Sequence, residues 1–171
     1  MPQDNNTNPN LNDFAISSEM FSWIKDNIPF GSTILEFGSG SGTIELCKHY
    51  KVFSIEHDKN WVGHCKESNY IHAPIKDYES FQWYDKDIVK QHLPSDYDLI
   101  IVDGPPNNPE TQVIGRHGFI ENLDMFDVSV PIIFDDVNRE DEYKNMIDAV
   151  NTLGKEHELI KGWQKSFAIV K

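Results

Sequence analysis

Short runs of apolar residues recur along most of this chain, and helical or mixed segments separate them. Runs that are apolar at nearly every position are typical of strands buried on both faces, as in a parallel sheet. Parallel strands need crossover connections, and most of the intervening segments are long enough to supply them as helices. The predicted strands are 33–37, 51–56, 70–73, 97–103, 130–135, 158–161 and 167–170.

The last two predicted strands are joined only by residues 162–166, a segment too short for a parallel crossover. We therefore expect these two strands to form an antiparallel hairpin at one edge of the sheet. The whole pattern predicts an α/β fold with a doubly wound, mostly parallel seven-stranded sheet and a C-terminal antiparallel hairpin.

The chain before the first strand divides into two parts. Residues 1–12 are polar, rich in asparagine and without periodicity, so we expect a flexible arm there. Between residue 13 and Pro29, apolar residues recur at helical spacing, which predicts an amphipathic helix packed on the domain. A later helix is expected over 140–153. With 171 residues in the chain, we expect 13–171 to form one domain.

The formal net charge of −13 disfavours nucleic-acid partners, because such a surface repels phosphate backbones. No apolar run reaches the length of a membrane helix, and the N-terminal residues lack the basic and apolar regions of a targeting signal. Two cysteines do not make a disulfide framework. We therefore expect a cytoplasmic protein that acts on a small molecule and has neither a membrane nor a nucleic acid as partner.

A glycine-rich turn, EFGSGSG from Glu36 to Gly42, follows the first predicted strand directly and opens a helix. Glycines let a ligand approach the backbone closely, and the N–H groups at a helix start favour polar or anionic ligand groups. The second strand ends at Glu56, where a carboxylate can accept hydrogen bonds from both ribose hydroxyls. Together these features predict an adenosine site. Its candidate residues are Glu36, Gly38, Ser39, Gly40, Gly42, Glu56 and His57.

The glycine spacing distinguishes between nucleotides. A dinucleotide fingerprint has a glycine where this chain has Thr43, and no Gly-Lys-Ser/Thr of a P-loop follows. The turn instead resembles the acidic-x-Gly-x-Gly-x-Gly motif of class I S-adenosylmethionine-dependent methyltransferases. The resemblance to this family extends from about residue 14 to the end of the sequence. The resemblance implies a Rossmann-like methyltransferase fold and S-adenosylmethionine as cofactor. It also implies that Glu36 helps to hold the methionine amino group and Glu56 the ribose.

The adenine side of the site is less sharply defined by the sequence. The resemblance suggests 73–77, after the third predicted strand, with Asp77 able to accept a hydrogen bond from the adenine amino group. Trp61 follows Glu56 closely enough to lie near the adenine ring.

Acidic residues follow the fourth and fifth predicted strands. Asp103 ends the fourth strand, and Asp135 and Asp136 end the fifth. Because neighbouring parallel strands end side by side, these carboxylates should converge at the switch point of the sheet. Carboxylates so placed repel one another unless a positive charge lies between them, and Mg²⁺ is the hard cation that oxygen ligands favour. The candidate metal ligands are Asp103, Asp135 and Asp136.

This arrangement resembles metal-dependent O-methyltransferases of the catechol and macrocin types. That resemblance implies methyl transfer to a small hydroxylated acceptor, a sugar among the candidates, with the metal lowering the pKa of the acceptor hydroxyl. The base is left open, because Pro106 stands where the catechol type has lysine. The candidate catalytic residues are Asp103, which is also a candidate cofactor contact, and His117, the base candidate nearest in sequence. Arg116 and Arg139 could bind the acceptor.

Several alternatives remain at this point. Asp135 and Asp136 could instead cap the following helix and pair with Arg139. The protein could bind the cofactor without transferring a group, or it could be an aminopropyltransferase, although Asp103 is followed by Gly-Pro-Pro and not by further acidic residues. The oligomeric state is left open by the sequence.

Overall fold

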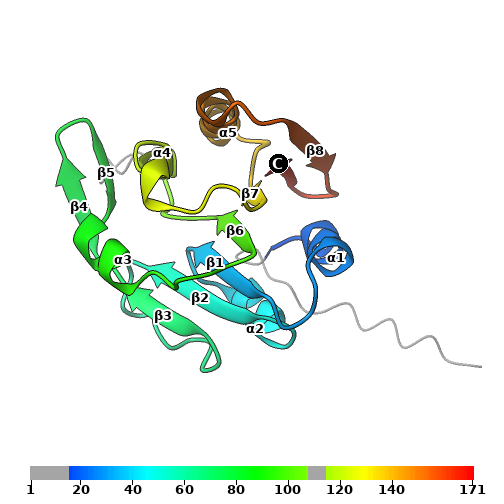
Figure 1. Cartoon of the computed structure of the whole chain (residues 1–171), viewed down its shortest axis with the longest axis horizontal. Helices are drawn as coiled ribbons and strands as arrows, with labels where there is room; N and C mark the ends of the chain where they lie inside the picture. The colour runs from blue at the N-terminus through cyan, green and yellow to red at the C-terminus, as the bar shows by residue number, and fades with distance from the viewer. Residues whose placement is uncertain (1–15, 108–114) are drawn as a thin grey trace, which may run out of the picture.

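A seven-stranded sheet forms the centre of the molecule in a computed structural model that describes residues 16–107 and 115–171 (Figure 1). The strand order is β3-β2-β1-β6-β7-β9-β8. The first five strands in this order are parallel, whereas β9 is antiparallel to both β7 and β8. The predicted fold is therefore confirmed. The bounds are β1 Thr33–Phe37, β2 Lys51–Glu56, β3 Asn69–His72, β6 Leu99–Val102, β7 Ile132–Phe134, β8 His157–Lys161 and β9 Ser166–Val170.

Helices cover both faces of this sheet, because successive strand residues alternate between two buried clusters. Ile34 belongs to the cluster that α1 and α2 cover, and Leu35 belongs to the cluster on the other face. That second face is covered by α3, α4 and α5, which Figure 1 shows on the side away from α1. The helices are α1 Ser18–Asn27, α2 Ser41–Cys47, α3 Lys86–His92, α4 His117–Ile120 and α5 Glu140–Leu153, with a 3₁₀ turn at Leu123–Met125.

The first helix begins later than the periodicity suggests. The Ser17 hydroxyl accepts a hydrogen bond from the Met20 backbone N–H at 3.1 Å, so Ser17 caps the helix and α1 starts at Ser18. The predicted arm at 1–12 and the predicted helical residues 13–15 lie outside the described residues.

A small second sheet was not predicted. Strand β4 (Ile75–Tyr78) pairs antiparallel with β5 (Phe81–Tyr84). The turn between them has Glu79 at a φ of 46° and lacks the Asn-Gly or Asp-Gly signal that marks most tight hairpins. The local sequence therefore did not predict the β4–β5 hairpin. The hairpin matters for the site, because Trp83 and Tyr84 at its end are fully buried.

Among the described residues, no helix is long and apolar enough to cross a membrane.

Candidate functional site

A pocket of about 390 Å³ opens where the chain order of the sheet reverses, at the carboxyl ends of β1, β2, β6 and β7. From β1 the chain continues to β2 and β3 on one side, whereas β6 and β7 lie on the other. Ligands of doubly wound sheets bind at such a switch point, and the volume lies within the range of small-molecule sites. The pocket is lined by Gly38, Ser39, Glu56, His57, Asp58, Trp61, Tyr84, Asp103, Gly104, Pro106, Arg116, Asp136, Arg139 and Lys165.

Two glycines bring the ends of β1 and β6 into direct backbone contact. Gly38 has a φ of 86°, and a Cβ built on it would lie 3.0 Å from the carbonyl oxygen of Asp103. A Cβ on Gly104 would lie 2.9 Å from the Gly38 Cα. Any larger residue would push the two loops apart, so these glycines define the closely packed wall of the pocket.

Glu56 stands at the tip of β2 with its carboxylate held by backbone donors. Its Oε2 accepts a hydrogen bond from Ser39 N at 2.9 Å, and its Oε1 accepts one from Asp58 N at 2.8 Å. His57 Nδ1 lies 3.0 Å from the same Oε1. Burial raises the pKa of Glu56, but these hydrogen bonds outweigh it and hold the pKa below its ordinary value. Glu56 is therefore an oriented anion in the pocket.

Glu36 lies behind the glycine turn and does not line the pocket. Its carboxylate accepts hydrogen bonds from the Thr43 hydroxyl at 2.9 Å and the Ser54 hydroxyl at 2.8 Å. Burial raises the pKa of Glu36 to about 7, against the opposing effect of these hydroxyls. In this position Glu36 ties the turn to β2 from within the core.

Like Glu56 and Glu36, the other candidate cofactor residues fall into a group that lines the pocket and a group that does not. Gly38, Ser39, Glu56, His57 and Asp103 line the pocket. Gly40 donates its N–H to the Thr43 hydroxyl at 3.1 Å, and a Cβ on Gly42 would lie 2.9 Å from Ile16, so both glycines serve the packing of the turn. Asp77 lies exposed on β4, apart from the residues that line the pocket.

Tyr84 was not predicted from the sequence as a site residue, because its place depends on the unpredicted β4–β5 hairpin. The residue is fully buried, and among the described residues its hydroxyl has no hydrogen-bond partner. A Cβ on Gly104 would lie 2.5 Å from that hydroxyl, so the hydroxyl reaches the wall of the pocket. A buried hydroxyl without a partner costs free energy, and a ligand in the pocket could supply the missing partner. Trp61 also lines the pocket.

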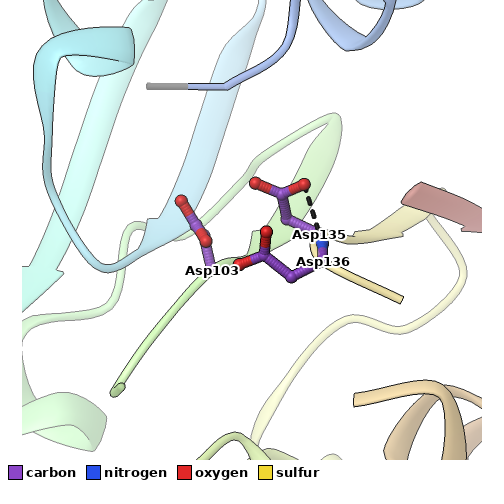
Figure 2. Close-up of side chains that lie close together, drawn as sticks. All are labelled: Asp103, Asp135 and Asp136. Atoms are coloured by element: carbon purple, nitrogen blue, oxygen red, sulfur yellow. Dashed lines mark hydrogen bonds between the residues drawn. The ribbon is translucent and has the colours of Figure 1, made fainter. Parts of the chain in front are cut away.

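The candidate metal ligands Asp103, Asp135 and Asp136 come together at the ends of β6 and β7 (Figure 2). Oxygen atoms from the three side chains lie within 4.8 Å of one another. The Asp135 carboxylate accepts a hydrogen bond from Asp136 N at 2.8 Å, which Figure 2 marks. Asp136 adopts a left-handed conformation with a φ of 56°, one that aspartate tolerates better than most residues. The turn after β7 thus directs both aspartates to the same place.

The Arg116 guanidinium lies among these carboxylates. Its side chain is only 3% exposed, and Nη2 lies 2.9 Å from Asp103 Oδ1 and 2.8 Å from Asp136 Oδ2. Nη1 donates to the Asp135 carbonyl oxygen, and Nε lies 3.7 Å from Glu142 Oε2. Burial lowers the pKa of Arg116, but the surrounding carboxylates raise it by more than burial lowers it. The pKa therefore lies above its ordinary value and the side chain stays charged.

Lys165 supplies a second positive charge from the residue before β9. Its Nζ donates to Asp135 Oδ2 at 2.6 Å and lies 3.8 Å from Asp136 Oδ1. Burial lowers the pKa of Lys165, and the neighbouring Asp135 and Asp103 raise it above its ordinary value. Lys165 was not among the site residues predicted from the sequence. The signal for it was available, because β9 runs antiparallel to β7 and its first residues must lie at the carboxyl ends of the parallel strands.

The donor set does not fit a Mg²⁺ ion. Mg²⁺ demands octahedral oxygen coordination at about 2.0–2.1 Å. Here an oxygen atom of each aspartate already lies within hydrogen-bonding distance of Arg116 or Lys165. A divalent cation on the same oxygens would lie beside two fixed positive charges and be repelled by both. The repulsion among the aspartates is thus relieved by side chains of the protein itself.

His117 lies away from the acidic cluster. It is the first residue of α4, and its Nε2 lies 2.8 Å from Glu121 Oε1. It lines a separate hollow of about 320 Å³, together with residues that include Asn107 and Asp141. Since Arg116 turns inward at the start of this helix, the next side chain points elsewhere. The structure therefore does not bring His117 to Asp103.

The capping alternative for the two aspartates is wrong in part. The residue at the N-cap of α5 is Arg139, and its side chain makes no capping hydrogen bond. Arg139 does lie near Asp136, with Nη1 3.4 Å from Oδ2, and its side chain is 64% exposed at the rim of the pocket. The Asp136 side chain is thus engaged with Arg116 and Arg139, and the contribution of Asp136 to the start of α5 comes from its carbonyl oxygen, which accepts a hydrogen bond from Arg139 N at 2.9 Å.

Comparison with solved structures places the fold among methyltransferases. A Pyrococcus furiosus methyltransferase aligns with a TM-score of 0.55 and 16% identity over 90% of this chain and 81% of the other. A Staphylococcus aureus protein assigned as a caffeoyl-CoA O-methyltransferase aligns with a TM-score of 0.60 and 12% identity over 93% of this chain and 86% of the other. The S-adenosylmethionine-bound magnesium protoporphyrin IX methyltransferase of Synechocystis aligns with a TM-score of 0.51 and 15% identity over 90% of this chain and 79% of the other.

No protein-family model matches the sequence, and no curated protein matches it either. The structural likeness, at 12–16% identity, shows the fold alone: this chain has the Rossmann-like fold of class I methyltransferases.

Proposed function

We propose that this protein is an S-adenosylmethionine-dependent methyltransferase that acts on a hydroxyl group of a small acceptor, a sugar among the candidates. The observation that carries the proposal is Glu56, an oriented carboxylate at the tip of β2 that lines the same pocket as Gly38 and Ser39. An anion at this point, beside a close glycine turn at the switch point of the sheet, is the arrangement that a nucleoside ligand requires.

The residues present fit S-adenosylmethionine. Glu56 Oε2 accepts one hydrogen bond, from Ser39 N, and can accept a second from a ribose hydroxyl. The Trp61 ring offers an aromatic surface for the adenine. The buried Tyr84 hydroxyl, which lacks a partner among the described residues, would gain one from the ligand. When bound, the cofactor supplies an electrophilic methyl group.

Asp103 is the proposed proton acceptor. It lines the pocket, and one of its oxygens is oriented by Arg116 at 2.9 Å. Burial and the charge of Asp135 raise the pKa of Asp103 well above its ordinary value, against the opposing effect of Arg116. A carboxylate with a raised pKa takes up a proton more readily near neutral pH, as a general base must. Arg139 and Lys165 line the same pocket and offer donors to acceptor oxygens.

The preference for a small acceptor over a nucleic acid is inferred from charge. A net charge of −13 disfavours nucleic acid, whereas the pocket of about 390 Å³ is assigned to the cofactor and does not measure the acceptor. The structural neighbours do not decide the point, because one is part of a complex that methylates a translation termination factor and another is a magnesium protoporphyrin methyltransferase.

The first experiment is calorimetric titration of S-adenosylmethionine and S-adenosylhomocysteine into the protein, with NAD as a negative control. Glu56→Gln keeps the shape of the side chain but removes the charge that binds the ribose. We expect it to weaken binding of both ligands by about 10- to 100-fold, the loss typical of a hydrogen bond to a charged group.

Glu158→Gln is the matched control, because Glu158 is an exposed carboxylate on β8 outside the pocket. It should bind the cofactor like the wild type. Failure of the wild type to bind S-adenosylmethionine, or tighter binding of NAD, would refute the proposal. Cofactor binding without methyl release in a screen of hydroxylated acceptors would favour a binding module over an enzyme.

A further inference from the structure

The acidic cluster at the ends of β6 and β7 contains its own cations. Asp103, Asp135 and Asp136 have oxygens within 4.8 Å of one another, the separation expected of ligands to one metal ion. Yet Arg116 Nη2 lies 2.9 Å from one of these carboxylates and 2.8 Å from another, and Lys165 Nζ lies 2.6 Å from the third. Each acidic group that would bind a metal is therefore paired with a side chain.

The position of Arg116 is built into the packing. It is 3% exposed and immediately precedes α4. That helix packs closely on β5, because a Cβ on Gly118 would lie 2.3 Å from the fully buried Trp83 ring. A guanidinium held this way cannot swing into solvent to make room for an ion without losing its ion pairs with Asp103 and Asp136 and leaving the buried Glu142 carboxylate without the guanidinium beside it, which is unfavourable.

Lys165 is held by a different part of the fold. It precedes β9, which pairs antiparallel with β7, so the strand pairing itself delivers the ammonium group to Asp135. Asp135 is fully buried, and Lys165 provides its side-chain ion pair. Two independent elements, the α4 segment and the C-terminal hairpin, thus bring a positive charge to the same three aspartates.

We infer that Arg116 and Lys165 take the electrostatic place of a divalent cation in this cluster, so that the protein binds no metal there and transfers its methyl group without one. Arg116 is then a positioning residue for Asp103. The second half of this inference rests on the proposed methyltransferase function, whereas the absence of metal affinity does not.

The test is titration of Mn²⁺ followed by its electron paramagnetic resonance signal, which reports free ion directly. The wild type is expected to leave Mn²⁺ free. Lys165→Met removes one of the two positive charges and should raise Mn²⁺ affinity by about tenfold or more, because a like charge close to the ion has gone. Lys165→Arg, which keeps the charge, is the matched control and should leave Mn²⁺ free.

Arg116→Met and Arg116→Lys form a second pair with the same expectation, and Mn²⁺ should raise the melting temperature of a methionine variant that binds it. In the methyl-transfer assay, EDTA should leave the wild-type rate unchanged and added Mg²⁺ should not raise it. Wild-type binding of one Mn²⁺, or a rate abolished by EDTA and restored by Mg²⁺, would overturn the inference. So would folded methionine variants that fail to gain Mn²⁺ affinity.

If neither methionine variant folds, the wild-type titration decides, since stoichiometric Mn²⁺ binding overturns the inference and its absence supports it. Failure to bind S-adenosylmethionine would refute the proposed function alone, because the Mn²⁺ measurement needs no cofactor.

Discussion

Replacing Glu36 with glutamine should make the protein more stable at alkaline pH. Glu36 is fully buried in the core behind the glycine turn, and its pKa is raised from 4.5 to about 7. The folded state therefore binds this proton more tightly than the unfolded state does. The contribution of protonated Glu36 to the free energy of unfolding is present at acidic pH and is lost as pH rises through about 7.

The size of the effect follows from the two pKa values. The difference between 4.5 and about 7 corresponds to a penalty of about 3 kcal/mol once Glu36 ionises in both states. Between pH 5.5 and pH 8, about 2 kcal/mol of that penalty should develop. Glutamine cannot ionise but retains the carbonyl acceptor and the shape, and the Thr43 and Ser54 hydroxyls can still bond to it.

The assay is urea unfolding of the wild type and Glu36→Gln at several pH values between 5.5 and 8. The free energy of unfolding of the variant should exceed that of the wild type by an amount that grows by about 2 kcal/mol across this range. Glu158→Gln, which removes an exposed carboxylate, should run parallel to the wild type. If the free energies of unfolding of Glu36→Gln and the wild type change in parallel with pH, then burial does not raise the pKa of Glu36 and the reasoning is refuted.

Two further substitutions test the packing around the pocket. Tyr84→Phe removes a buried hydroxyl that has no partner among the described residues, so it should raise the free energy of unfolding by about 1 kcal/mol in urea. The same variant should weaken S-adenosylmethionine binding about fivefold in calorimetry, and lower stability without ligand would contradict this interpretation. Gly118→Ala places a Cβ 2.3 Å from the buried Trp83 ring and should destabilise the protein by about 1–3 kcal/mol in urea unfolding, despite the higher helix propensity of alanine. A stability equal to that of the wild type would mean that α4 does not press on β5.

Much of the fold followed from the sequence because its signals are local. Continuous apolar runs mark strands buried on both faces, and the predicted ranges 33–37 and 51–56 coincide with β1 and β2. The short link between the last two runs was enough to require an antiparallel hairpin. The second sheet escaped prediction because its turn at Glu79 carries no hairpin signal.

The candidate site was predictable where it depends on strand ends. Residues that follow parallel strands must gather at one edge, so Asp103 and Asp136 were expected near each other, and Glu56 near the glycine turn. Which side chains turn inward from the loops was not predictable. Arg116 and His117 are adjacent in the sequence, but one lies among the aspartates and the other in a separate hollow.

The sequence by itself thus determined the strands of the main sheet, its antiparallel end and the edge at which the acidic residues meet. Only the tertiary structure decided what neutralises those acids, because the answer depends on contacts between distant segments. The packing of α4 on Trp83 holds Arg116 at the acids, and the pairing of β9 with β7 brings Lys165 to Asp135. A pattern read along the chain records periodicity and spacing, whereas the place of a charge in a buried cluster is set by which surfaces pack together.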